Sequence, residues 1–174
     1  MTQEPWLNEQ ELAAWVRLVA VMELLPGVLD SQLRQDAQLT HFEYHVLAML
    51  SEAPERTLQM TELAGLTNAT LSRLSRAVGR LEEKGLVTRM SCPGDRRARN
   101  ATLTEAGWAT VRETAPGHAI TVREHVFAAL SPEQATQLEE IAAAVLSRVD
   151  PHGTMAATYT RYDRSRRSGE KEPR

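Results

Sequence analysis

Residues 60–87 read MTELAGLTNATLSRLSRAVGRLEEKGLV, and this stretch decides the fold. Over residues 71–84 the apolar side chains recur at i, i+3, i+4 and i+7, the spacing of one face of an α-helix, which Gly85 then ends. A shorter helix is expected over about 60–66, and residues 67–70 form the turn and cap between the two. Two helices joined by so short a turn predict a helix-turn-helix.

The residues that follow predict a β-hairpin. Residues 86–90 (LVTRM) read as a strand, 92–95 (CPGD) as a turn and 101–103 (ATL) as the returning strand. The polar pair Arg99-Asn100 stands where the returning strand begins, and it predicts a shorter hairpin or a more mobile wing. Helix, helix and hairpin in this order indicate a winged helix-turn-helix.

Long helices flank this unit on both sides. The expected N-caps are, in order, Asn8, Thr40, Thr104 and Ser131. Pro-Gly pairs at 26–27 and 116–117 predict a kink or short break in the first of these helices and an interruption in the third. The last helix is expected to end near Val149. The predicted fold class is therefore mainly α with a small β-hairpin wing.

Composition excludes several classes of protein. The longest uncharged runs, such as 63–72 and 151–160, reach about half of the roughly 18 to 20 residues that a membrane span needs, so no membrane helix is expected. The first ten residues carry no basic residue and no apolar run, which predicts a cytoplasmic protein. Cys92 is the only cysteine, which excludes an internal disulfide. Without a phosphate-binding glycine loop, serine elbow or metalloprotease motif, we expect neither an enzyme nor a cofactor.

The charges are segregated along the chain. Lys+Arg number 20 against 23 Asp+Glu, a net charge of -3, yet residues 73–100 hold eight basic and three acidic side chains. Residues 161–174 hold six basic and three acidic side chains, so the rest of the chain is acidic. A compact basic block on an acidic body predicts a protein that binds a polyanion.

The basic block contains a set of residues suited to reading DNA. Arginine can donate two hydrogen bonds to guanine, and serine or threonine can bond a base edge or a phosphate. Arg80 lies further along the helix, where backbone contacts are expected, and Arg97 at the hairpin tip suits the minor groove. Asp95 is expected to pair with an arginine and fix the shape of the wing. The residues expected to face the major groove are Thr70, Ser72, Arg73 and Arg76. The alternative is the solvated basic face of an ordinary core helix.

The sequence resembles the MarR family of winged-helix transcriptional regulators. The stretches that carry the resemblance are LTHFEYHVLAML (39–50), the stretch over 60–87, GDRR (94–97) and LTEAGW (103–108). TAPGHAITVREHVFAALSPEQ (114–134) resembles an actinobacterial-type branch. The resemblance implies a regulator, typically a repressor, that binds a pseudo-palindromic site in double-stranded DNA. It assigns Thr70, Ser72, Arg73 and Arg76 to the major groove and Asp95 and Arg97 to the wing.

The resemblance also implies a homodimer formed by the terminal helices, which agrees with their apolar residues. The chain then divides into an N-terminal dimerisation region (1–36), a DNA-binding domain (37–104), C-terminal dimerisation helices (105–149) and a basic, disordered tail (150–174).

Members of this family are typically released from DNA by a small aromatic or anionic effector bound between the dimer helices and the winged domain. The residues proposed to line such a pocket are Trp15, Phe42, Tyr44, His45 and Trp108. Ordinary core or dimer packing is the alternative for each of them.

Three further interpretations remain open. His41 with His45, and His118 with His125, stand at spacings that could supply imidazoles to zinc, although we assign no metal site. Cys92 lies near Arg89 and Arg96, whose charges favour a reactive thiolate, so oxidation could move the wing. In the last interpretation, the basic stripe meets an acidic partner protein and the fold is a protein-interaction module.

Overall fold

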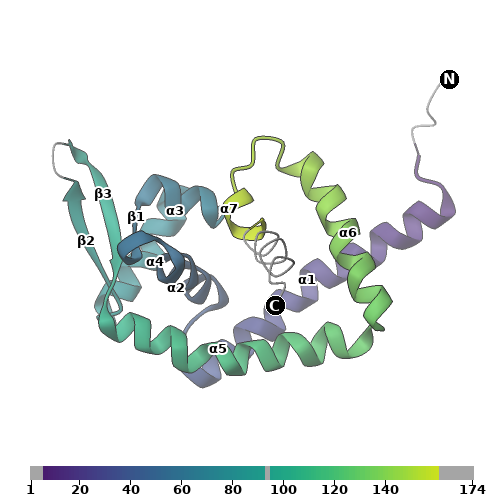
Figure 1. The fold of residues 1–174 in the computed structure, drawn as a ribbon, viewed down its shortest axis with the longest axis horizontal. Coiled ribbons are helices and arrows are strands. Elements are labelled where there is room, and N and C mark those ends of the chain that lie inside the picture. Colours follow the sequence, from purple (N-terminus) through teal and green to yellow (C-terminus); the bar gives the residue numbers. More distant parts are fainter. Residues whose placement is uncertain (1–5, 93–94, 161–174) are drawn as a thin grey trace, which may run out of the picture.

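The computed structural model describes residues 6–92 and 95–160, and it places the side chains of all of these except residues 92 and 95–98. Figure 1 shows a lobe of short helices and a small sheet, with α5 (Glu105–His125) running along its base. Two long helices, α1 (Glu9–Ala37) and α6 (Pro132–Val149), extend away from this lobe.

The lobe is the predicted winged helix-turn-helix. Helix α2 (His41–Glu52) precedes α3 (Met60–Leu66) and α4 (Leu71–Glu83), and strands β2 (Val87–Cys92) and β3 (Asp95–Leu103) form the wing. The Thr40 capping box is present, because its hydroxyl accepts from the Glu43 N–H and the Glu43 carboxylate accepts from the Thr40 N–H. The predicted fold class is confirmed.

The sheet has a third strand that the sequence pattern did not indicate. The short 3-10 turn η1 (Pro54–Arg56) leads into β1 (Thr57–Gln59), which pairs antiparallel with β3 to give the order β1-β3-β2. The Thr57 and Thr102 hydroxyl oxygens lie 2.9 Å apart across this pairing. The wing is thereby attached to the segment that enters α3.

The wing hairpin is not shortened at its polar residues. Strand pairing runs from Val87 opposite Leu103 to Ser91 opposite Arg99, with an irregularity between Ser91 and Cys92. The prediction of a shorter hairpin is wrong because strand pairing uses backbone groups. Polar side chains are therefore tolerated where the strands face solvent, as at the exposed Arg99.

The core lies among α2, α3, α4 and the sheet. Its fully buried side chains include Leu47, Leu50, Leu63, Leu74, Val78 and Leu81. Helix α5 begins against this core at Gly107, where a Cβ atom would lie 2.2 Å from the Leu86 carbonyl oxygen. Glycine at this position lets the first turn of α5 touch the backbone that enters the wing.

Neither helix is broken at its Pro-Gly pair. Helix α1 runs through Pro26 for 29 residues, and α5 runs through Pro116 to end at His125, followed by the 3-10 turn η2 (Phe127–Ala129). A proline inside a helix removes one backbone hydrogen bond, and neighbouring turns can continue the helix around it. At Gly117 a Cβ atom would lie 3.0 Å from the Asp36 carboxylate, so α5 packs closely on α1 there.

Helix α1 also meets the length and composition expected of a membrane span, with a mean hydropathy of 1.8 over its most apolar window. The spacing of charges predicted that no helix of this chain could span a membrane. By length and by composition, α1 contradicts that prediction. Only 6% of that window is buried within the chain, so the apolar surface of α1 is largely uncovered.

The chain beyond α6 returns to the lobe, as the yellow α7 (Ala156–Tyr159) shows in Figure 1. The Asp150 carboxylate accepts hydrogen bonds from the N–H groups of Thr154 and Met155 and from the Tyr159 hydroxyl. The Thr158 hydroxyl donates to the Met49 sulfur at 3.7 Å. The predicted disorder is therefore wrong for residues 151–160, while 161–174 lie outside the described residues.

Candidate nucleic-acid interface

Helix α4 presents two opposite faces. Leu74, Ala77, Val78 and Leu81 are buried in the core, whereas Ser72 and Arg76, one turn apart, are exposed on the other side. The Thr70 hydroxyl caps the helix by accepting from the Arg73 N–H at 3.2 Å, and it lies 3.1 Å from the Ser72 hydroxyl. The first turn of α4 therefore offers hydroxyl groups and arginine side chains together.

The two arginines of this first half have different surroundings. The Arg73 guanidinium lies over the Phe42 ring, 4.1 Å from its centroid, so α2 holds it in place. Within the described part of the chain, the Arg76 side chain has no hydrogen-bond or ion-pair partner. The Arg73 side chain is therefore held in one position by Phe42. The Arg76 side chain is unpaired among the described residues and can bind a ligand.

A buried carboxylate fixes the second half of α4. Glu43 is 2% exposed, and its carboxylate accepts from Arg80 Nε at 2.5 Å and lies 3.4 Å from Lys84 Nζ. Lys84 Nζ also donates to the Gln38 carbonyl at 2.7 Å. Burial raises the pKa of Glu43, but the Thr40 N–H and the two cations outweigh burial and hold it below its ordinary value.

This role of Glu43 was not predicted from the sequence, which indicated only the N-cap at Thr40. Arg80, predicted to contact the DNA backbone, is bound to Glu43, yet its side chain remains half exposed. Its contact with DNA stays a prediction.

A second missed ion pair attaches the wing to α4. The Glu82 carboxylate accepts from the Arg89 backbone N–H at 2.9 Å and from the Arg89 guanidinium at 2.5 Å. The Arg89 guanidinium also donates to the Ser75 hydroxyl at 3.3 Å. Strand β2 and helix α4 are therefore held in one orientation, as a two-part DNA reader requires.

The hairpin tip holds three residues singled out above. The side chains of Cys92, Asp95 and Arg97 lie outside the described residues, so the predicted wing contacts and the predicted thiol chemistry are not tested.

A cavity of about 760 Å³ opens beside α4. It brings together two of the predicted pocket residues, Phe42 and His45, with residues from α1, from the turn before α4 and from α4 itself. Three arginines of α4 belong to its lining: Arg73, Arg76 and Arg80. The cavity therefore combines cationic groups with an aromatic ring.

The other three predicted pocket residues lie elsewhere. Trp15 is half exposed on α1, and Tyr44 is buried with its ring 4.8 Å from that of His118. Trp108 packs against the core, with the Arg56 guanidinium 4.5 Å from its ring centroid. Helical spacing groups aromatics by sequence, whereas the cavity is assembled from separate elements.

His41 of α2 and His118 of α5 lie near each other where these two helices join. The rings of His41 and His118 lie 6.3 Å apart, and His118 Nδ1 lies 3.3 Å from the Gln32 side-chain oxygen. Burial lowers the pKa of His41, although Asp30 opposes this, and burial together with the charge of His41 lowers the pKa of His45 and His118. His125 lies apart from these three, and its Nδ1 is 2.9 Å from the Thr121 carbonyl oxygen. Among the described residues, no three metal-binding side chains converge on one point.

Comparison with known proteins gives concordant results. Residues 39–98 match the MarR family. The transcriptional repressor MprA of Escherichia coli strain K12 is 29% identical over 107 residues, which cover 62% of this chain and 60% of the relative. The match thus spans about three fifths of the length of that curated relative.

Two solved structures from Streptomyces coelicolor match over more of the chain. Sco3205, a MarR family transcriptional regulator crystallised in complex with DNA, has a TM-score of 0.79 and 44% identity over 84% of this chain and 92% of that one. AbsC, another MarR family transcriptional regulator, has a TM-score of 0.75 and 37% identity over 84% of this chain and 96% of that one. These relatives agree with the predicted actinobacterial-type branch and are regulators, not enzymes. The chain belongs to the MarR family of winged-helix transcriptional regulators.

Proposed function

We propose that this protein is a sequence-specific regulator, most simply a repressor, that binds double-stranded DNA in the cytoplasm. The observation that carries the proposal is the exposed face of α4, where Ser72 and Arg76 stand opposite the core beside the anchored Arg73. The ion pairs of Glu43 and Glu82 hold this face and the wing in fixed orientations. The relative solved in complex with DNA supports the same conclusion.

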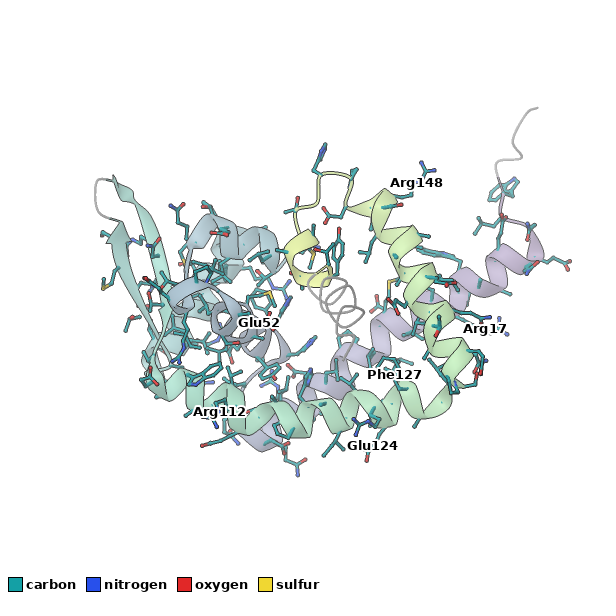
Figure 2. All side chains as sticks on the ribbon, in the orientation of Figure 1. Arg17, Glu52, Arg112, Glu124, Phe127 and Arg148 are labelled. Carbon is teal, nitrogen blue, oxygen red and sulfur yellow. The ribbon has the colours of Figure 1, made fainter. Side chains whose placement is uncertain are left out.

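The protein acts as a homodimer in this proposal. Figure 2 shows side chains crowded within the lobe, whereas α6 and the first half of α1 lie apart from it. Large apolar side chains there are more than 40% exposed, among them Val16, Leu24, Ile141 and Val149. An apolar surface of this extent on two helices supports a helix-bundle interface with a second copy. The two α4 helices would then enter major grooves about 34 Å apart.

A small aromatic or anionic effector is the proposed signal, and the cavity beside α4 is its proposed site. Its volume of about 760 Å³ lies within the range of roughly 300 to 1,000 Å³ found for small-molecule sites. Guanidinium groups pair with carboxylates through two parallel hydrogen bonds, and the Phe42 ring offers an apolar surface beside them.

The first test is a titration of the purified protein into DNA fragments flanking its own gene, at two salt concentrations and with excess competitor DNA. Selective retention of one fragment that survives the higher salt supports the regulator. Uniform binding that disappears with salt contradicts it and favours the protein-interaction module.

Arg76→Ala separates base reading from general charge. It should weaken binding to the selected fragment by about 1 to 3 kcal/mol and relax the preference at one base position. Arg112→Ala is the matched control, because it removes the same charge from an exposed position of α5. Equal losses in both variants would show that Arg76 contributes only charge.

A further inference from the structure

The segment that follows α6 turns back and docks on the lobe. The Asp150 carboxylate at the end of α6 accepts hydrogen bonds from the N–H groups of Thr154 and Met155 and from the Tyr159 hydroxyl. Figure 1 shows that this turn brings α7 beside α3, on the side of the lobe that faces α6. The chain is thereby attached to the lobe a second time, in addition to its connection through α5.

Contacts with α2 and α3 hold this segment on the lobe. The Thr158 hydroxyl donates to the Met49 sulfur at 3.7 Å, and Thr158 also lines a small cavity of about 130 Å³ together with Leu66. At Gly65 of α3, a Cβ atom would lie 3.2 Å from the Thr154 methyl carbon, so the two segments pack closely. These contacts place the end of α7 at the surface of the helix-turn-helix.

The docked segment lies close to the first turn of α4. Consecutive Cα atoms are about 3.8 Å apart, so at most about 19 Å separates Gly65 from Thr70, the N-cap of α4. Residues 161–174 follow the docked segment, and a chain of that length spans at most about 46 to 50 Å. The C-terminal residues therefore begin within reach of DNA that is bound by α4.

These C-terminal residues have the composition of a phosphate-binding segment. Residues 161–174 hold six basic and three acidic side chains, and the part over 161–167 (RYDRSRR) contains four arginines and one acidic residue. Double-stranded DNA carries one negative charge per roughly 1.7 Å of its axis, and arginines that neutralise phosphates release counterions whatever the base sequence. The segment therefore has the charge that a DNA backbone binds.

We propose that α7 anchors the C-terminal segment on the helix-turn-helix, so that the arginines over 161–167 bind DNA phosphates beside the groove that α4 enters. The inference rests on the proposed function, because it adds a third DNA-contacting segment to α4 and the wing. Docking of residues 151–160 on the lobe raises the effective concentration of these arginines at the phosphates.

Acidic side chains of the same lobe are the alternative partners of this segment. Glu52 and Glu62 line the small cavity beside α7, together with Ala157 and Thr158. If the arginines bound these carboxylates instead of DNA, their removal would leave DNA binding unchanged or strengthen it. The two cases predict different effects on DNA binding, so a titration with DNA separates them.

The test replaces Arg164, Arg166 and Arg167 together by alanine in the full-length protein. Fluorescence anisotropy measures its affinity for the DNA fragment selected above and for an unrelated fragment of equal length, at several salt concentrations. The slope of log K against log salt should become less steep by about 2 to 3, since each phosphate contact contributes about 0.9. Both fragments should lose affinity by the same factor, because phosphates carry no sequence information. An unchanged slope, or tighter binding, overturns the proposal.

The matched control replaces the same three arginines by lysine. Lysine keeps the positive charge, so this variant should retain the salt dependence of the parent protein. A change of slope equal to that of the alanine variant would show that charge is not what these residues contribute, and it would overturn their assignment to phosphates.

Asp150→Ala tests the anchor, because it removes the acceptor of the hydrogen bonds that shape the turn before α7. It also removes a negative charge, which by itself favours binding to DNA. Anchoring predicts the opposite result, a loss of affinity of about two- to fivefold. Glu113→Ala removes the same charge from an exposed position of α5 and should bind DNA at least as tightly as the parent. Equal affinity of the two variants overturns the role of α7.

Thr158→Ala provides a milder disruption, since it removes only the hydrogen bond to Met49, and it should weaken DNA binding in the same direction by a smaller factor. Failure of the proposed function is a separate outcome. A parent protein that selects no DNA fragment refutes that function, whereas the salt slopes on the unrelated fragment still decide whether residues 161–167 bind phosphates.

Discussion

The guanidinium of Arg73 lies 4.1 Å from the centre of the Phe42 ring, and this contact joins the first turn of α4 to α2. A cation over an aromatic face gains about 0.5 to 1 kcal/mol at an exposed site. The contact also limits the positions that the long Arg73 side chain can take. Arg73 is therefore already oriented in the protein alone, as its proposed contact with DNA would require.

Replacing Phe42 with leucine should weaken DNA binding by about 0.5 to 1 kcal/mol, or roughly two- to fivefold in Kd, because Arg73 loses this orientation. Fluorescence anisotropy with the selected fragment measures the change. Trp108→Leu is the matched control, since it removes a similar contact with Arg56 away from α4. Unchanged affinity in Phe42→Leu would show that the stacking does not position Arg73.

Glu43→Gln should lower the free energy of unfolding at neutral pH by about 1 to 3 kcal/mol, because two cations lose a buried charged acceptor. The pKa of Glu43 is lowered in the folded state, so its contribution is present above its ordinary value of 4.5 and is lost as pH falls through the folded value. Denaturant unfolding at several pH values measures this. The difference between the parent and Glu43→Gln should shrink in acid, and a difference independent of pH would contradict the ion-pair role.

The three partly buried histidines, His41, His45 and His118, should make the protein less stable as pH falls below about 6.5, the ordinary pKa of histidine. Their pKa values are lowered in the folded state, so the unfolded chain binds more protons in that range and acidification favours unfolding. Thermal unfolding from pH 7.5 to 5.5 should show a falling Tm. His118→Gln should reduce the slope of Tm against pH, and an unchanged slope would contradict the contribution of His118.

Replacement of glycine by alanine should change the stability of the protein in opposite directions at two positions. Gly107→Ala places a Cβ atom against the Leu86 carbonyl and should cost about 3 kcal/mol of stability. Gly27→Ala meets no atom within 4 Å in the middle of α1 and should add about 0.5 to 1 kcal/mol. Denaturant midpoints measure both, and a stable Gly107→Ala protein would show that the approach of α5 can relax.

The helix-turn-helix could be predicted because its evidence is local: the spacing over residues 71–84 and the caps at Thr40 and Thr70 act within one turn. Strand β1 could not, since three residues form a strand only when β3 lies beside them. The helices are not broken at Pro26 or Pro116, because the surrounding helix outweighs one missing hydrogen bond.

The candidate site, like the fold, could be predicted from the sequence only in part. The basic residues of α4 follow from composition and spacing, but their partners do not. Glu43 and Arg80 are 37 residues apart, and Thr158 reaches Met49 across 109 residues. Such pairs are set by how the elements pack, which periodicity does not specify. The cavity likewise draws on several elements, so only Phe42 and His45 were anticipated among its lining.

The uninterrupted α1 has the geometry of a lever. Its 29 residues span about 43 Å, and its close contact with α5 lies near one end, where Asp36 approaches Gly117. A tilt of a few degrees about that pivot moves the first turn of α1 by about 2 to 3 Å, since the arm beyond it is roughly 40 Å long. A small rotation at this contact would therefore be amplified at the opposite end of the helix.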